Sequence, residues 1–205
     1  TLFSSSVAQL NLIVGTIFAS LLVTGSQTWL YNADRLSEFP LGLFGVAIGT
    51  VILPHLSSRH AAADADGYAK AIDWGLRMVM LAGVPAGVGL LMLAEPLASA
   101  MFQHGAFTAD DARMTGLALS ATAIAVPAFM LTKVLLPAFF ARQDTTTPMR
   151  AAVITVFINV ALTAAITAPL WHYGVAGAHA GIALATALAG VANAALLWVW
   201  LHRDG

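Results

Sequence analysis

The sequence has no cysteine and very few charged residues. Its 205 residues include no Cys, and only 9% are Asp, Glu, Lys or Arg. The first absence excludes a disulfide framework and thiolate metal sites. A soluble domain carries about 25% charged residues, so this chain has too few polar groups to cover a surface that faces water. The net charge of −1 gives no electrostatic reason to expect nucleic acid as a partner.

Long apolar runs dominate what is present. Hydrophobic residues make up 59% of the chain and the mean hydropathy is +0.82, which predicts that membrane lipid surrounds it. About 20 residues cross the hydrocarbon as a helix. The runs therefore predict an all-α membrane protein that forms one lobe over residues 1–205, with about six transmembrane helices at 2–24, 26–58, 68–102, 108–141, 148–169 and 174–202. The chain starts at Thr1 with no basic n-region, so we expect an internal piece of a longer protein rather than a signal peptide.

Local signals place several helix ends. Gly25-Ser26 predicts a turn between the first two helices. Thr108 is predicted to cap a helix whose first turn is acidic. Thr147 followed by Pro148 predicts a second N-cap, with proline at the first helical position.

Glycine pairs spaced by four residues predict close helix packing, although this pattern is common in membrane helices. They are Gly45 and Gly49, Gly83 and Gly87, and Gly177 and Gly181. The positive-inside rule sets the orientation, because the basic residues fall mainly on one side of the predicted helices. Those that indicate the cytoplasmic side are Arg59, Lys70, Arg77, Arg142, Arg150 and Arg203.

A polar stripe runs along the first half of the second predicted helix, before a bend expected at Pro40. At helical spacing its members share one face and its flank: Gln27, Thr28, Tyr31, Asn32, Asp34, Arg35 and Glu38. Ionised groups at bilayer depth are costly to desolvate. We therefore interpret the stripe as the polar wall of a transport cavity.

Arg35 is the residue best suited to an anionic ligand, because its planar guanidinium can meet phosphate oxygens at two points. Asp34 and Glu38 would either hold that guanidinium in place or compete with the ligand for it. Two other interpretations stay open. The three charges could form a closed ion-pair cluster that only fixes helix packing, or an acid could relay protons. Lys133, between Pro127 and Pro137, either snorkels to the interface or lies at the cytoplasmic end of the same cavity.

No catalytic motif supports an enzyme. The sequence contains no H-E-x-x-H, no G-x-S-x-G and no phosphate-binding loop. The histidines do not combine with acids at metal-ligand spacing, so we expect no metal and no cofactor.

Several motifs together resemble the MurJ (MviN) family of lipid II flippases. They are Tyr31-Asn-Ala-Asp-Arg-Leu-Ser-Glu-Phe-Pro40, Gly45-Val-Ala-Ile-Gly-Thr50 with Leu53-Pro54, Asp73-Trp-Gly-Leu-Arg77, Phe102-Gln-His-Gly-Ala-Phe107, Lys133-Val-Leu-Leu-Pro137, and Phe140-Ala-Arg-Gln-Asp144 with Thr147-Pro148. They occur in order and cover most of residues 8–203. The first and last are specific, since related multidrug and polysaccharide exporters lack the combination.

The resemblance implies the second six-helix lobe of a multidrug/oligosaccharidyl-lipid/polysaccharide exporter-type fold, with the first lobe as a missing partner. It implies export of the lipid-linked peptidoglycan precursor, lipid II, across the bacterial inner membrane by alternating access. Arg35 matches a cavity arginine of the family, Asp34 and Glu38 its acidic neighbours, and Thr28 a small polar position in the cavity lining. Arg35 would contact the pyrophosphate.

This chain departs from the family at two positions. Some members have acids of a proposed sodium site where this chain has Gly15 and Thr163, so the driving ion is open. Two other functions also stay open: export of another polysaccharide-lipid or a drug, and a structural membrane module whose charges only pack helices.

Overall fold

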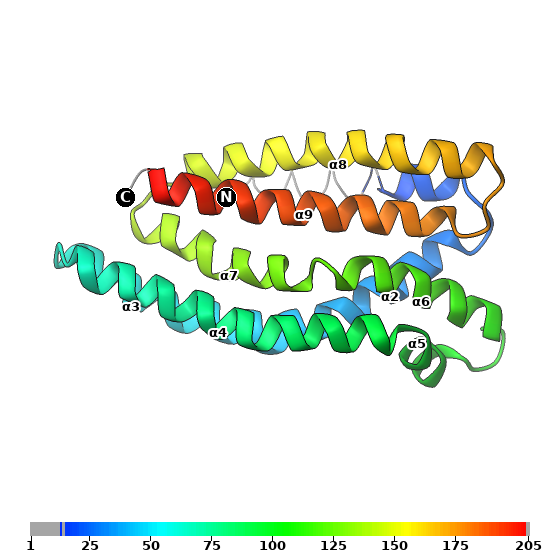
Figure 1. Ribbon diagram of the computed structural model, residues 1–205, viewed down its shortest axis with the longest axis horizontal. Coiled ribbons are helices and arrows are strands. Elements are labelled where there is room, and N and C mark those ends of the chain that lie inside the picture. The colour runs from blue at the N-terminus through cyan, green and yellow to red at the C-terminus, as the bar shows by residue number, and fades with distance from the viewer. Residues whose placement is uncertain (1–12, 14, 204–205) are drawn as a thin grey trace.

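The computed structural model describes residue 13 and residues 15–203, which form an elongated bundle of helices (Figure 1). Residues 15–20 are helical, and most of the expected helix 2–24 lies outside the described residues. The elements that follow are α2 Ser26–Pro40, η1 Leu41–Val46, α3 Ala47–Ala61, α4 Ala65–Met92, α5 Ala94–Phe102, α6 Ala109–Ala123, α7 Val126–Ala141, α8 Thr146–His172 and α9 Ala178–Arg203.

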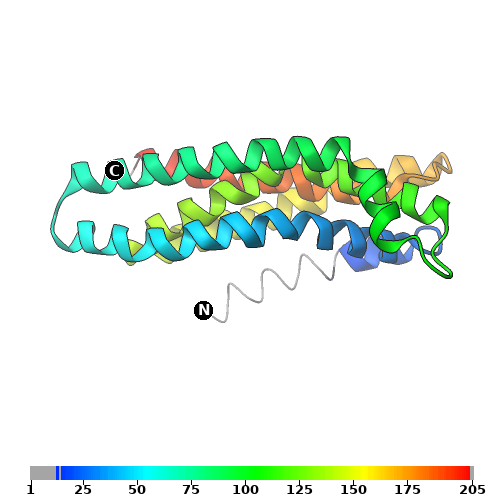
Figure 2. The same cartoon turned by 90° about the horizontal axis from the view of Figure 1, so that it is seen from below.

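Gly25 makes the turn that was expected before α2. It has a φ of 104°, in the left-handed region that favours glycine. A methyl group on its Cα would lie 2.8 Å from the Trp29 ring, so a side chain would not fit there. The helix then continues to Ala61, and its character changes just after Pro40, where η1 is a π-helical segment. Figure 2 shows α2, η1 and α3 as one continuous rod.

The third expected helix, 68–102, is two helices in the structure. α4 starts at Ala65, and a break at Leu93 separates it from α5. Asp64 caps α4, because its carboxylate accepts a hydrogen bond from the Gly67 backbone N–H at 2.9 Å. That bond and the neighbouring Arg59 guanidinium hold the pKa of Asp64 below its usual range, so the cap stays ionised near neutral pH.

The fourth expected helix, 108–141, is also broken. α6 ends at Ala123, α7 starts at Val126, and the two are bent by 46°. Pro127 explains the break, because it has no N–H to offer to the Ala123 carbonyl and its ring crowds that oxygen. The expected cap at Thr108 is confirmed as a capping box, in which Asp111 accepts from the Thr108 N–H at 2.8 Å.

The predicted N-cap at Thr147 is wrong. α8 starts at Thr146, two residues before the expected Pro148, with Thr145 at the N-cap position, and its first turn is satisfied by a different side chain. The Asp144 carboxylate accepts from the backbone N–H groups of Thr146 at 2.9 Å and Thr147 at 3.0 Å. An Asp before a Thr-Thr-Thr run offered this alternative cap, and its charge favours a helix N-terminus.

The helices suit a membrane. Within the described residues, four are long and apolar enough to cross it, or five if the bent pair α6–α7 is one span. The α3–α4 turn, the α7–α8 turn and the end of α9 lie at one end of the bundle. The α5–α6 and α8–α9 connections lie at the other (Figure 1). The prediction of an all-α membrane protein is confirmed.

Two apolar clusters hold the bundle together. One joins α3, α4, α7 and α9 around Leu56, Val79 and Met130. The other joins α2, α5, α6 and α9 around Ala33 and Leu119. At least one glycine of each pair makes the close approach that was expected, whereas a methyl group at Gly177 would be in ordinary contact, 3.8 Å from Leu117. Methyl groups at Gly49, Gly87 and Gly181 would lie 3.1 Å from the Lys133 carbonyl oxygen, 3.0 Å from the Ala123 carbonyl oxygen and 3.0 Å from an Ile166 methyl, respectively.

Candidate transport cavity

The polar stripe of α2 is exposed, and the opposite face of the helix is buried. Trp29, Ala33 and Leu36 pack into the bundle. The side chains left outside are Gln27, Thr28, Tyr31, Asp34, Arg35 and Glu38. The amphipathic spacing therefore has the orientation that the sequence predicts, with apolar groups in the core and polar groups on an open surface.

A cavity of about 470 Å³ opens beside this stripe. It lies between α2, the helical residues before it, α6 and α9. Its lining combines carboxylate, hydroxyl and apolar groups: Gly15, Thr16, Ala19, Gln27, Thr28, Leu30, Tyr31, Asp34, Thr122, Ile182, Ala183 and Thr186. Of the predicted site residues, Thr28 and Asp34 line the cavity. Tyr31 connects it to Arg35, one turn further along α2.

Tyr31 is the side chain that orients Arg35. Arg35 Nε donates a hydrogen bond to the Tyr31 hydroxyl oxygen at 3.0 Å, and Nη2 donates to the same oxygen. The guanidinium carbon lies 5.0 Å from the centroid of the Tyr31 ring, a distance at which a cation is attracted to an aromatic face. A neutral phenol thus holds the guanidinium without neutralising it.

The closed ion-pair cluster is not observed. Among residues 13 and 15–203, Arg35 makes no ion pair with Asp34 or Glu38. Asp34 is the preceding residue and turns toward the cavity, while Glu38 is exposed one turn later. The charge of Arg35 therefore faces open space and is available to an anionic group.

Trp29 anchors the back of the stripe to two other helices. Its indole Nε1–H donates to the Asp111 carboxylate at 2.8 Å, which joins α2 to the start of α6. Its ring lies 4.9 Å from the ring of His179 on α9. His179 is itself buried and contacts the Met114 carbonyl oxygen at 2.9 Å through Nε2. These contacts fix the rotation of α2, and so the direction in which its polar face points.

Sequence reasoning missed Thr122 and Thr186 as cavity residues. Thr122 on α6 accepts a hydrogen bond from the Ser37 hydroxyl at 3.2 Å, and Thr186 on α9 accepts from the Asn159 amide at 3.2 Å. Isolated threonines in apolar helices carry little local signal, because their hydroxyls also bond to their own helix. Only the packing of α6 and α9 beside α2 reveals them.

The two family positions of the proposed sodium site bring no carboxylate here. Thr163 is buried, and its hydroxyl donates to the Asn159 side-chain oxygen at 3.0 Å. Gly15 lines the cavity without a side chain. Within the part of the chain that the structure describes, no group of three or more His, Cys, Asp or Glu could hold a metal ion. Because positions 15 and 163 carry Gly and Thr, they do not supply the carboxylates of the proposed sodium site.

Lys133 lies apart from this cavity. Its aliphatic stem packs on η1, where a methyl group at Gly45 would lie 3.1 Å from its Cγ. Its side chain is exposed. The structure therefore brings Thr28, Asp34 and Arg35 together on α2 and leaves Lys133 on α7.

Comparison with known proteins decides the family. A family model described as lipid II flippase MurJ matches residues 1–205. The chain belongs to the MurJ family. It is therefore a multi-pass segment of the bacterial inner membrane, which agrees with its apolar helices.

Curated MurJ relatives are similar along the whole chain. A probable lipid II flippase MurJ of Vibrio cholerae is 46% identical over 204 residues, which cover 100% of this chain and 38% of the relative. The lipid II flippase MurJ of Burkholderia cenocepacia is 39% identical over 203 residues, which cover 99% of this chain and 38% of the relative. The chain thus spans well under half the length of these MurJ relatives.

Solved structures show the same helix arrangement. Lipid II flippase MurJ in an inward closed conformation matches with a TM-score of 0.84 and 28% identity, over 96% of this chain and 40% of that one. An outward-facing multidrug resistance MATE family transporter of the MOP superfamily matches with a TM-score of 0.81 and 18% identity, over 98% of this chain and 43% of that one. The second likeness shows the fold alone, and together they confirm the exporter-type fold.

Proposed function

We propose that this chain is the second lobe of a MurJ flippase that moves lipid II from the cytoplasmic to the periplasmic leaflet. The observation that carries the proposal is the exposed Arg35 guanidinium, held by the Tyr31 hydroxyl beside a cavity that is lined by hydroxyl, carboxylate and apolar groups. A charged, sugar-bearing headgroup cannot cross bare hydrocarbon at a tolerable cost, so it needs a polar route through protein. Membership of the MurJ family supports lipid II as the substrate.

In this proposal Arg35 contacts the pyrophosphate, and its fork meets two phosphate oxygens at once. Asp34 and Glu38 flank that contact and keep the guanidinium from binding the anion too tightly to release it. Thr28, which precedes Asp34 by six residues, offers a hydroxyl to the headgroup from the cavity wall. Lys133 lies apart from this cavity in the structure, and we assign it to the cytoplasmic end of the transport route, where its flexible stem would let the ammonium follow the headgroup.

The mechanism is alternate exposure of the cavity to the two sides of the membrane. The lipid keeps all its bonds, so the protein acts as a transporter rather than an enzyme. The exposed stripe needs an opposite wall, which we assign to the first lobe of the same protein.

The test uses the complete protein that contains this chain, produced in cells depleted of their own lipid II flippase. We expect growth to be restored and lipid II to become accessible at the outer face of the inner membrane. Normal membrane levels of the protein without any exposed lipid II would refute the proposal. If the cells instead gained only drug tolerance, the chain would belong to a drug exporter, the second function that its MATE-like fold allows.

Replacement of Tyr31 by phenylalanine should reduce lipid II exposure about three- to ten-fold, because the guanidinium loses the hydroxyl that orients it but keeps the aromatic face. Replacement by leucine, which removes the ring as well, should reduce it further. The measurement is lipid II accessibility at matched protein levels. Equal activity of all three proteins would show that Arg35 needs no positioning by Tyr31.

A further inference from the structure

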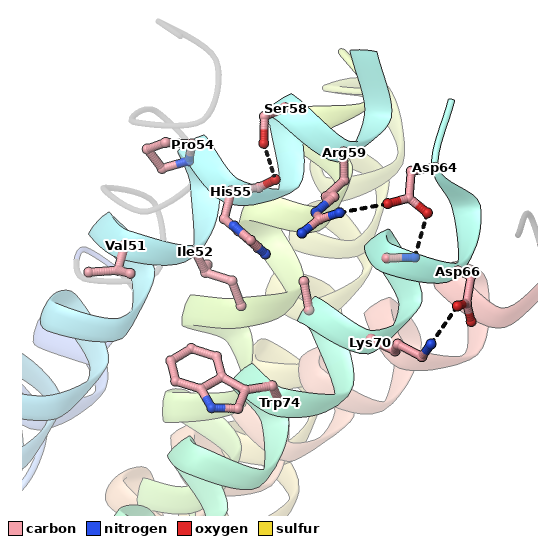
Figure 3. A pocket seen from close by; sticks show the side chains of 12 residues that line it. Val51, Ile52, Pro54, His55, Ser58, Arg59, Asp64, Asp66, Lys70 and Trp74 are labelled. Carbon is pink, nitrogen blue, oxygen red and sulfur yellow. Dashed lines mark hydrogen bonds and ion pairs between the residues drawn. The ribbon is translucent and has the colours of Figure 1, made fainter. Parts of the chain in front are cut away.

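A second, larger hollow lies far from the α2 stripe. It is a groove of about 890 Å³ between α3 and α4, close to the turn that joins them (Figure 3). Its floor is apolar and includes Val51, Ile52, Ala71 and Trp74. Val51 and Trp74 are exposed, so the floor is open at the surface of this lobe.

The rim of this groove carries two ion pairs. Arg59 Nη1 lies 2.8 Å from Asp64 Oδ2, and Lys70 Nζ lies 2.5 Å from Asp66 Oδ2. The Lys70 and Asp66 side chains are 74% and 78% exposed. Exposed pairs of this kind are weak and exchange partners readily. The rim therefore offers two cationic and two anionic groups with no net charge.

His55 adds a further polar group on the α3 side. Figure 3 shows its ring beside the Arg59 guanidinium, above the floor. The His55 side chain makes no hydrogen bond or ion pair with another residue that the structure describes. An imidazole that can donate is thus free to meet an oxygen atom of a ligand seated between Arg59 and Lys70.

The side chains of the groove are of the kinds that suit a membrane surface. Tryptophans such as Trp74 collect where hydrocarbon meets headgroups. All four charges of the rim lie on the side of Trp74 toward the helix turn, whereas Val51 and Ile52 lie on the bundle side. An apolar floor that ends in a charged rim matches the profile of a phospholipid, with its acyl chain below and its headgroup above.

We propose that this groove binds one phospholipid whose headgroup carries both a phosphate and a primary ammonium, as in phosphatidylethanolamine. The phosphate takes the place of Asp66 on Lys70 and of one Asp64 contact on Arg59. The ammonium donates to the released carboxylates of Asp64 and Asp66. An acyl chain lies along Val51 and the Trp74 ring.

The pairing of charges selects this headgroup. An anionic lipid without an amine would leave Asp64 and Asp66 facing a negative phosphate, and like charges at that distance repel. A choline headgroup has the right charges, but its quaternary nitrogen has no N–H to give to a carboxylate. Only the primary ammonium supplies both the charge and the donors that charge-assisted hydrogen bonds need.

The experiment compares lipids retained by the complete protein. After reconstitution in equal parts of phosphatidylethanolamine, phosphatidylcholine and phosphatidylglycerol, bound lipids are counted by native mass spectrometry. We expect the protein to retain about five times as much phosphatidylethanolamine as either competitor. Two charge-assisted hydrogen bonds at an exposed rim would account for a difference of this size. Equal retention of the three lipids, or preference for phosphatidylglycerol, would overturn the proposal.

The variant D66N/K70Q removes one ion pair from the rim without changing the net charge, and it should bring the preference below about two-fold. The matched control is D73N/R77Q. Asp73 and Arg77 form an ion pair of the same spacing on the same helix, at 2.7 Å, but they do not line the groove. The control should keep the wild-type preference. If it loses as much as the rim variant, the effect is not that of this groove.

A third variant tests the floor without touching a charge. Val51→Trp places a bulky ring in the exposed part of the groove and should lower retention of phosphatidylethanolamine at least about three-fold. Unchanged retention would show that no acyl chain lies there and would count against the site. The Arg35 cavity is not involved in any of these variants, so failure here leaves the proposed flippase function intact.

Discussion

Replacement of Arg35 by alanine is expected to abolish lipid II exposure in the complete protein, with a loss of at least about 100-fold, because a charged, bidentate contact to a diphosphate has no substitute. The structure gives the reason. The guanidinium is exposed and unpaired by acids, so its removal deletes a group that binds ligand and breaks no ion pair among the described residues. The measurement is growth of flippase-depleted cells, together with lipid II accessibility.

Two further variants make this test specific. Arg35→Lys keeps the charge but loses the planar fork, and activity should fall about ten-fold rather than vanish. Arg113→Ala is the matched control, because Arg113 is another exposed arginine, which pairs with Asp110 at 3.6 Å on α6. It should be active. Normal growth with Arg35→Ala, at normal membrane levels, would remove Arg35 from the site. A loss of protein level alone would instead favour a structural module.

Replacement of Gly87 by leucine should destabilise the lobe by about 1–3 kcal/mol or more, as overpacking of a tight contact does. Gly87 packs where α6 meets α7, and even a methyl group there would lie 3.0 Å from the Ala123 carbonyl oxygen and 3.3 Å from the Pro127 ring. Neither neighbour is a flexible side-chain end, so the helices would have to separate. A lower unfolding temperature in detergent is the expected readout.

Gly89 provides the control for this substitution. It lies on the same helix two residues later, and a methyl group added there would meet nothing within 4 Å. Gly89→Leu should therefore leave the unfolding temperature almost unchanged. Equal effects at the two positions would mean that helix propensity, and not the contact between α4 and the α6–α7 break, determines the stability.

Two kinds of feature could be predicted from the sequence. Some depend only on residues within one helical turn, and others depend on which face of a single helix is apolar. The cap at Thr108 needs only residues within one turn, and the outward stripe of α2 follows from its spacing. The break before α7 was not predicted, although Pro127 was recognised. A proline inside a membrane helix is compatible with a mild bend or a full break. Here the outcome depends on how α4 packs beside it.

The residue that accepts the hydrogen bonds of Arg35 also could not be predicted from the sequence. Asp34, Glu38 and Tyr31 are all near it in sequence, and opposite charge favours the two acids. Side chains of a helix lean toward its N-terminus, which carries Arg35 back toward Tyr31, four residues earlier, and away from Glu38, three residues later. The α3–α4 groove lay wholly beyond sequence reasoning, because it depends on the separation of two helices.

The π-helical η1 also adjusts the rotational phase of the long rod that contains it. Ile52 follows Ala33 by 19 positions, which in an uninterrupted α-helix would turn their side chains about 100° apart. Both are nonetheless buried against the bundle. One residue absorbed by wider turns corrects an offset of that size. The polar stripe of α2 can therefore face outward before η1, while the apolar side chains of both α2 and α3 still point into the bundle.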